Sequence, residues 1–114
     1  MRLAAVALGL ILSACPAWSG FVNGNTLHEW CKASSPQVIS YLMGSYDAYE
    51  LDQMLLDESP KNKVCLPESV LSSQAADVVC KYVADTPSTR HYPAAALVWN
   101  ALLDSFPCAA SQTP

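Results

Sequence analysis

Five cysteines in a chain of 114 residues constrain the fold more than any other feature of this sequence. Cys15 falls in an apolar N-terminal segment, which leaves Cys31, Cys65, Cys80 and Cys108 in the rest of the chain. An even number of cysteines in a small exported domain is typical of a disulfide framework, here of two bonds. The chain is therefore expected to be exported and cross-linked, provided that its N-terminus is an export signal.

The first nineteen residues have the three parts of a secretory signal peptide. Arg2 precedes the apolar run Leu3–Leu12, and small residues follow it as far as Ser19. The run is too short to cross a membrane, which takes about 20 apolar residues. We therefore expect residues 1–19 to be a cleaved signal and residues 20–114 to form a single exported domain.

Two routes of signal cleavage fit the sequence and stay open. In the favoured route an ordinary signal peptidase cuts after Ser19, with Ala17 and Ser19 as the small pair and Pro16 extending the chain. In the alternative, Leu12-Ser13-Ala14-Cys15 is a lipobox and Cys15 is lipidated. Membrane attachment is expected only in that second case, and both routes remove Cys15 from the disulfide pairing.

The charge balance excludes one large class of partners. Without Arg2 the chain has five basic residues against ten acidic ones, which gives a net charge near −5. Nucleic-acid binding needs a basic face that neutralises phosphates, and this composition supplies none.

Apolar spacing predicts helices from the start of the domain. Leu27, Trp30 and Cys31 lie at i, i+3 and i+4, on one face of a first helix. Asn25 or Thr26 is expected to cap that helix.

A second helix is expected from Pro36 to Leu56, capped by Ser35. A wide buried stripe is predicted on it, made of Val38, Leu42, Tyr46 and Tyr49 with the flanking Ile39, Met43, Leu51 and Leu55. Gly44 interrupts this helix at a cost near 1 kcal/mol, which a close helix crossing is expected to offset.

Two more helices complete the expected architecture. The third is predicted to begin at Pro67 and to end at residues 85–88, and the fourth to run from Pro93 to Phe106, where Pro107 stops it. No useful strand alternation is present. The predicted fold class is all-α, a small four-helix bundle stapled by disulfides.

Helix geometry restricts the pairing of the four cysteines. Cys65 and Cys80 would lie about 20 Å apart along the third helix, too far for a disulfide. This excludes 65–80 together with 31–108. An antiparallel hairpin of the third and fourth helices would bring Cys108 back to Cys65, so the favoured pairs are Cys65–Cys108 and Cys31–Cys80.

No constellation of residues indicates catalysis. His28 and Cys31 lie at i and i+3, but a disulfide cysteine beside an exposed histidine explains them better than a thiol–imidazole pair or a metal site. The cysteines are separated by 34, 15 and 28 residues, unlike the tight ligand pairs that zinc prefers. Arg90 and His91 are expected to cap or salt-bridge at the helix turn. We therefore expect no enzyme activity, cofactor or metal.

Six motifs occur in order between residues 23 and 108. They are Gly24-Asn25-x-Leu27-x-x-Trp30-Cys31, Tyr41-x-x-Gly44-x-x-Asp47-Ala48, Cys65-Leu66-Pro67, Gln74-x-x-Asp77-Val78-Val79, Pro87-x-x-Arg90-His91-x-Pro93-Ala94-Ala95, and Ala101-Leu102 leading to Phe106-Pro107-Cys108. Together they resemble the Rap/Tai family of immunity proteins. The chain departs from the family at Val38, where many relatives have a cysteine, and at Cys80, which is an addition.

The resemblance implies a function. Members of this family are small, exported, helical proteins of Gram-negative bacteria that neutralise peptidoglycan amidase effectors of type VI secretion, often as dimers that plug the active site. It therefore implies a periplasmic, homodimeric inhibitor that binds an amidase and catalyses nothing.

The inhibitory surface is a separate question, because the shared motif residues look mostly structural. The polar loop 57–63 is the first candidate for the segment that enters the effector's cleft. Its predicted partner-binding residues are Asp57, Glu58, Ser59, Lys61, Asn62 and Lys63. With Asp57 and Glu58, the neighbouring carboxylates of Glu50 and Asp52 are either a solvated surface or an acidic docking patch for a basic partner. Asp47 belongs to the same run, but it either makes a structural hydrogen bond or faces a partner.

The main alternative is a periplasmic acid-stress chaperone, also small, helical and disulfide-bonded. Such a protein unfolds at low pH through dense positive charge, and this chain has few lysines beside its ten carboxylates. A hydrolase is a weaker third possibility, because no catalytic constellation is present.

Overall fold

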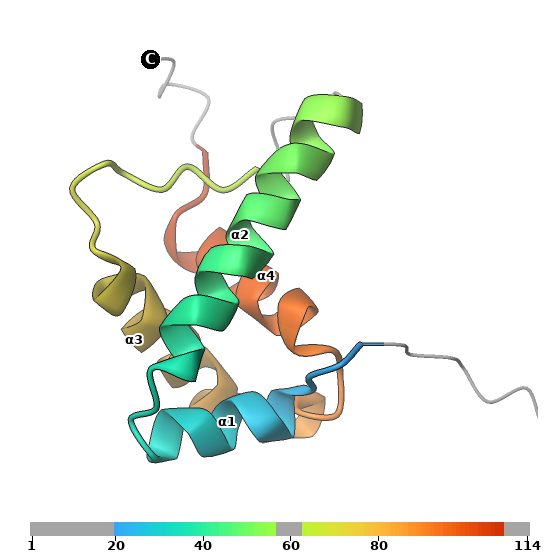
Figure 1. The fold of residues 1–114 in the computed structure, drawn as a ribbon, viewed down its shortest axis with the longest axis vertical. Coiled ribbons are helices and arrows are strands. Elements are labelled where there is room, and N and C mark those ends of the chain that lie inside the picture. The colour runs from blue at the N-terminus through green and yellow to red at the C-terminus, as the bar shows by residue number, and fades with distance from the viewer. Residues whose placement is uncertain (1–19, 57–62, 109–114) are drawn as a thin grey trace, which may run out of the picture.

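A computed structural model of the chain describes residues 20–56 and 63–108. Four α-helices follow one another: α1 (Gly24–Lys32), α2 (Gln37–Leu56), α3 (Ser72–Asp85) and α4 (Ala94–Ser105), with a 3-10 turn, η2 (Pro87–Thr89), between the last two (Figure 1). Within these two ranges only isolated bridges occur and no strand, which confirms the predicted all-α class. No helix in them is both long and apolar enough to cross a membrane. The expected signal, with Cys15, lies outside the described residues.

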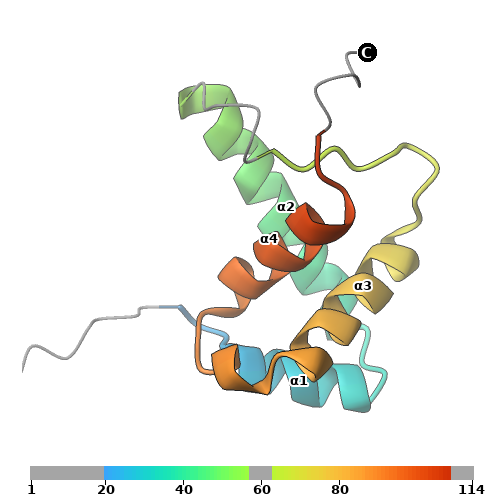
Figure 2. The same ribbon diagram turned by 180° about the vertical axis from the view of Figure 1, so that it is seen from behind.

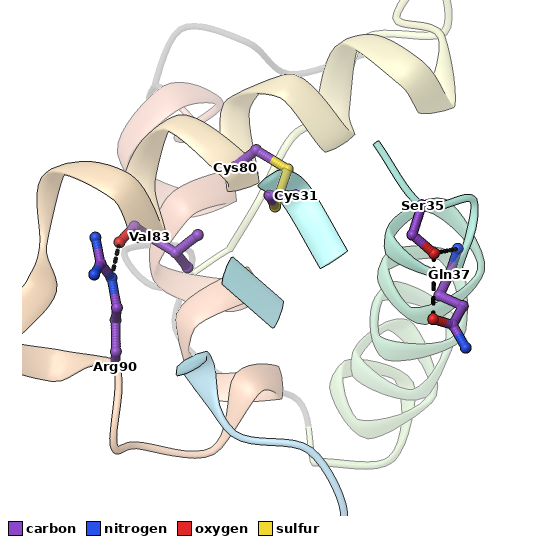
Figure 3. Close-up of a disulfide and its surroundings, with 6 residues drawn as sticks. All are labelled: Cys31, Ser35, Gln37, Cys80, Val83 and Arg90. Atoms are coloured by element: carbon purple, nitrogen blue, oxygen red, sulfur yellow. Dashed lines mark hydrogen bonds between the residues drawn. A yellow bond between two sulfur atoms is a disulfide. The ribbon is translucent and has the colours of Figure 1, made fainter. Parts of the chain in front are cut away.

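The helix starts differ from the predicted ones at two places. Asn23, and neither Asn25 nor Thr26, caps α1: its Oδ1 accepts a hydrogen bond from the Thr26 backbone N–H at 3.0 Å. Asn23 has an extended backbone, as a cap requires, whereas the residues after it are already helical. The predicted cap of α2 is confirmed, since Ser35 Oγ accepts from the Gln37 N–H at 3.3 Å (Figure 3).

The third helix begins five residues later than predicted. Pro67 starts a separate turn, closed by a bond from the Val70 N–H to the Pro67 carbonyl. The helix itself starts at Ser72, where the Gln74 side chain accepts the Leu71 N–H at 2.8 Å and so satisfies a backbone group that the first turn leaves open.

The core is formed by one side of each helix. Leu27 of α1, Leu42 of α2, Val79 of α3 and Leu97 of α4 are all buried, together with further small apolar residues of α3 and α4. Helices α3 and α4 form the antiparallel hairpin that the cysteine argument required, and α1 and α2 pack against it (Figure 2). Trp30 and Trp99 are half-buried at the edge of this core.

Both favoured disulfides are present. Cys31–Cys80 joins the end of α1 to α3 across a Cα separation of 5.5 Å (Figure 3). Cys65–Cys108 joins the segment before α3 to the segment that follows α4, with a Cα separation of 4.9 Å. Backbone bonds from Cys65 to Phe106 and from Cys108 to Lys63 brace the second bridge on both sides. The pairing argued from helix rise and the hairpin is therefore confirmed.

The buried stripe predicted on α2 is too wide. Met43, Leu51 and Leu55 are 51%, 56% and 74% exposed. The close helix crossing expected at Gly44 is also wrong, because a Cβ added there would have no atom within 4 Å. Among the described residues no further helix covers this side, so the apolar residues that face away from α3 and α4 are exposed.

Candidate partner-binding surface

Helix α2 is the longest element, and its C-terminal end extends past the other helices in both views (Figures 1 and 2). Six exposed residues of its solvent side fall within about 120° of the helix circumference. We call this set the outer face of α2: Met43, Gly44, Asp47, Leu51, Met54 and Leu55. Four of its members are apolar beyond glycine, which is unusual for a solvent-facing helix surface.

Carboxylates border this face. Asp47 lies on it, and Glu50 and Asp52 flank it on either side; all three are exposed. Helix α2 contains no lysine or arginine over its whole length. The surface therefore combines exposed apolar side chains with an excess of negative charge along the helix.

An aromatic groove lies on the inner side of the same helix, between α2 and α4. The rings of Tyr49 and Trp99 contact each other, with their centroids 3.4 Å apart and their planes inclined by 35°. The groove holds about 300 Å³ and is lined by Ser45, Tyr46, Ala48, Tyr49, Asp52, Ala95, Val98, Trp99 and Leu102. Tyrosine and tryptophan dominate the energetics of many protein interfaces, so this groove has the composition of a contact site.

Tyr46 ties the groove to the acidic border. Partial burial, and then a hydrogen bond to the Glu50 carboxylate, together raise the pKa of its phenol to about 12. The phenol is therefore neutral at physiological pH and holds Glu50 one helical turn away. This interaction orients a charged group at the edge of the outer face.

A second groove adjoins the predicted inhibitory loop. It holds about 430 Å³ and is lined by Tyr49, Glu50, Gln53, Met54, Lys63 and Val64. Of the predicted partner-binding residues, Lys63 is placed here, where it is half-buried and lines the same groove as Glu50. Asp57, Glu58, Ser59, Lys61 and Asn62 lie outside the described residues, so their part of the prediction stays a prediction.

The residues with chemical potential elsewhere have structural roles. All four cysteines of the described ranges are in disulfides, which removes the thiol from the His28–Cys31 pair. Partial burial and then the charges of Arg90 and Lys32 lower the pKa of His28. No cluster of three or more potential metal ligands occurs among residues 20–56 and 63–108.

Arg90 caps α3, as predicted for the helix turn. Its Nε donates to the Val83 carbonyl at 2.7 Å (Figure 3). Its Nη2 donates to the Ala84 carbonyl at 2.9 Å. A cation at the C-terminal end of a helix satisfies open carbonyls and complements the helix dipole. The arginine is therefore occupied by the fold.

The outer face was missed because apolar spacing was interpreted as burial. Apolar residues occur on every side of α2, and a helix that is apolar all round needs cover on every side. A four-helix bundle covers one side only. That mismatch between the number of helices and the width of the stripe was the available signal.

Comparison with known proteins identifies the chain's relatives. The family described as Rap1a immunity proteins matches residues 23–108, which covers all four helices and both disulfides. No curated protein and no solved structure matches the chain.

Proposed function

Because the chain belongs to the Rap1a immunity protein family, we propose that it protects its host by binding and sterically blocking a peptidoglycan amidase effector of type VI secretion. The observation that carries this proposal is the family match over residues 23–108. An immunity protein acts by forming a tight complex and needs no chemistry of its own. The paired cysteines and the structural use of Arg90 agree with such a role.

We place this action in the periplasm. Two features support that location: the signal-like segment of residues 1–19 and the two disulfides, which form and persist in oxidising compartments. Peptidoglycan lies in the same compartment, so an inhibitor there meets the effector before its substrate is damaged.

In the proposed mechanism, the polar loop 57–63 enters the cleft of the amidase. The loop joins the end of α2 to the segment that the Cys65–Cys108 bridge holds. Anchoring both ends of a binding loop lowers the ordering cost of association. The negative charge near −5 would speed encounter with a basic enzyme.

The family resemblance also leads us to propose a homodimer. Light scattering of the purified protein tests this directly, and a monomeric mass over the working concentration range would reject it. The proposed inhibition does not depend on the outcome, because one copy carries a complete loop and a complete outer face.

The decisive experiment uses the peptidoglycan amidases encoded in the same genome, each purified separately. We expect the chain, isolated from the periplasm with its disulfides formed, to bind one of them and stop its hydrolysis of peptidoglycan. Binding to none of them would reject the amidase proposal. A variant with residues 58–63 replaced by a glycine–serine linker should lose protection, whereas unchanged protection would remove the loop from the mechanism.

A further inference from the structure

We propose that the outer face of α2 is a contact surface for the effector, fitted to an apolar patch rimmed by lysine or arginine. This inference rests on the proposed immunity function and adds a second contact to the loop. The two would be continuous, because the outer face reaches Leu55 and the loop begins two residues later.

Gly44 gives the first argument. A glycine in a helix interior costs about 1 kcal/mol relative to alanine, so a mid-helix glycine calls for a packing reason. Within residues 20–56 and 63–108, nothing lies within 4 Å of a Cβ added at this position. The close approach that would explain a glycine at this position is therefore expected from another molecule.

The residues around Gly44 supply the second argument. Leu51 and Leu55 follow it at i+7 and i+11, on the same side of the helix, and Met54 lies beside them. Leu55 and Met54 are 74% and 81% exposed. A stripe that starts with a glycine and continues with large apolar side chains lets a partner approach closely at one end and contact apolar side chains at the other.

The charges around the outer face indicate which kind of molecule binds it. Asp47, Glu50 and Asp52 border the outer face, and α2 has no cation to balance them. A second copy of the chain docked on this face would bring six carboxylates together, and like charges brought together at an interface cost several kcal/mol.

The described cations relieve little of that repulsion. One of them, Lys63, shares a groove with Glu50 but not with Asp47 or Asp52. Lys32 is paired with Glu29 at 2.7 Å, Lys81 with Asp85 at 2.6 Å, and Arg90 with carbonyls of α3. A partner that brings its own lysines and arginines turns the repulsion into attraction. The face therefore fits a basic effector better than it fits itself.

The test measures binding to the amidase that the unaltered chain inhibits. Gly44→Leu fills the close-approach position, and the double variant Leu51→Gln/Leu55→Gln removes the apolar contact. Each should weaken binding by about tenfold or more, the loss typical of a central contact residue. Matched controls are Ala84→Leu, which adds the same side chain to an exposed position of α3, and Leu71→Gln, which removes a leucine that is 65% exposed elsewhere. Both controls should bind as the unaltered chain does.

Three results would overturn the inference, and they are distinguishable. Unchanged binding of the α2 variants, with the unaltered chain still inhibiting, would reject the surface and leave the immunity function intact. A dimer that these variants convert to monomer, with amidase binding retained, would show that a second copy covers the face. An unaltered chain that binds no amidase would reject the proposed function and this surface with it. Circular dichroism and a thermal melt establish that every variant is folded.

Discussion

The two halves of α2 show how this small protein separates stability from recognition. In the first half, Val38 and Leu42 are buried against the other three helices. In the second half, residues 47–56, the helix keeps only its inner side packed, where Tyr49 meets Trp99, and exposes Leu51, Met54 and Leu55. We call α1, α3, α4 and the first half of α2 the body, and residues 47–56 the distal half of α2.

Hydrophobic content alone therefore does not show which residues stabilise the fold. The body buries its apolar residues and is closed by two disulfides, whereas the distal half carries leucines and a methionine that stay largely exposed. If the distinction is correct, substitutions in the body should change stability, and substitutions on the outer face should change binding with little effect on stability.

Opening the body at its first disulfide is expected to have one of the two largest effects. Cys31 and Cys80 are 49 residues apart, and a cross-link closing a loop of that length stabilises by about 4 kcal/mol in the chain-entropy model. The double variant Cys31→Ser/Cys80→Ser should lose roughly 2–4 kcal/mol of unfolding free energy in a urea titration. A loss below about 0.5 kcal/mol would mean that packing alone holds α1 on α3.

A pair of leucines compares the two regions directly. Leu97 is 1% exposed in the body, and its replacement by alanine should cost about 2–5 kcal/mol through lost burial and a residual cavity. Leu55 is 74% exposed, and Leu55→Ala should stay within about 0.5 kcal/mol of the unaltered chain. Thermal or chemical unfolding of both variants checks the prediction. Equal losses would show that the distal half is part of the cooperative core.

Replacing two glycines by alanine should change the free energy of unfolding in opposite directions. A Cβ at Gly24 would clash with the Leu97 side chain and come within 2.7 Å of the Arg90 carbonyl oxygen, so Gly24→Ala should destabilise by about 1–3 kcal/mol. At Gly44 the added methyl meets open space, and Gly44→Ala should stabilise by up to about 1 kcal/mol. Unfolding titrations of the two variants measure both changes in free energy. A destabilised Gly44→Ala would remove the argument that the chain itself has no use for this glycine.

The same contrast explains what was predictable from the sequence. The four helices and both disulfide pairs followed from rigid quantities, since helix rise alone separates Cys65 from Cys80 and a short hairpin returns Cys108 to Cys65. The helix starts at Asn23 and Ser72 were missed, because several neighbouring residues can cap and the backbone conformation decides among them.

The candidate surface was predictable only in part. Its acidic residues are evident in the sequence, but the exposure of Leu51 and Leu55 depends on how many neighbours α2 has, which periodicity does not report. The contact between Tyr49 and Trp99 joins residues fifty positions apart, so it follows from the packing of α2 on α4 and from nothing local. Of the loop predicted to bind the effector, only Lys63 is among the described residues, and its role remains a prediction.

The smallest expected effect is the pH dependence of stability at Tyr46, where the two halves of α2 meet. The pKa of its phenol is about 12 in the folded chain, above the ordinary value of 10.0, because of burial and the bond to Glu50. A raised pKa means that the folded state holds the proton more tightly. This contribution to stability is therefore complete below pH 10 and is lost as the pH rises from 10 towards 12.

The loss should stay below about 1 kcal/mol, since solvent reaches part of the phenol and screens the interaction. The free energy of unfolding is measured from pH 8 to pH values approaching 12. It should fall more steeply with pH for the unaltered chain than for Tyr46→Phe. Because the phenol lies in the groove beside α4, a shallower slope in the variant would show that this end of α2 is held to the body. Parallel slopes would mean that Tyr46 titrates as a solvent-exposed tyrosine, and that the boundary between the stable body and the exposed distal half lies before residue 46.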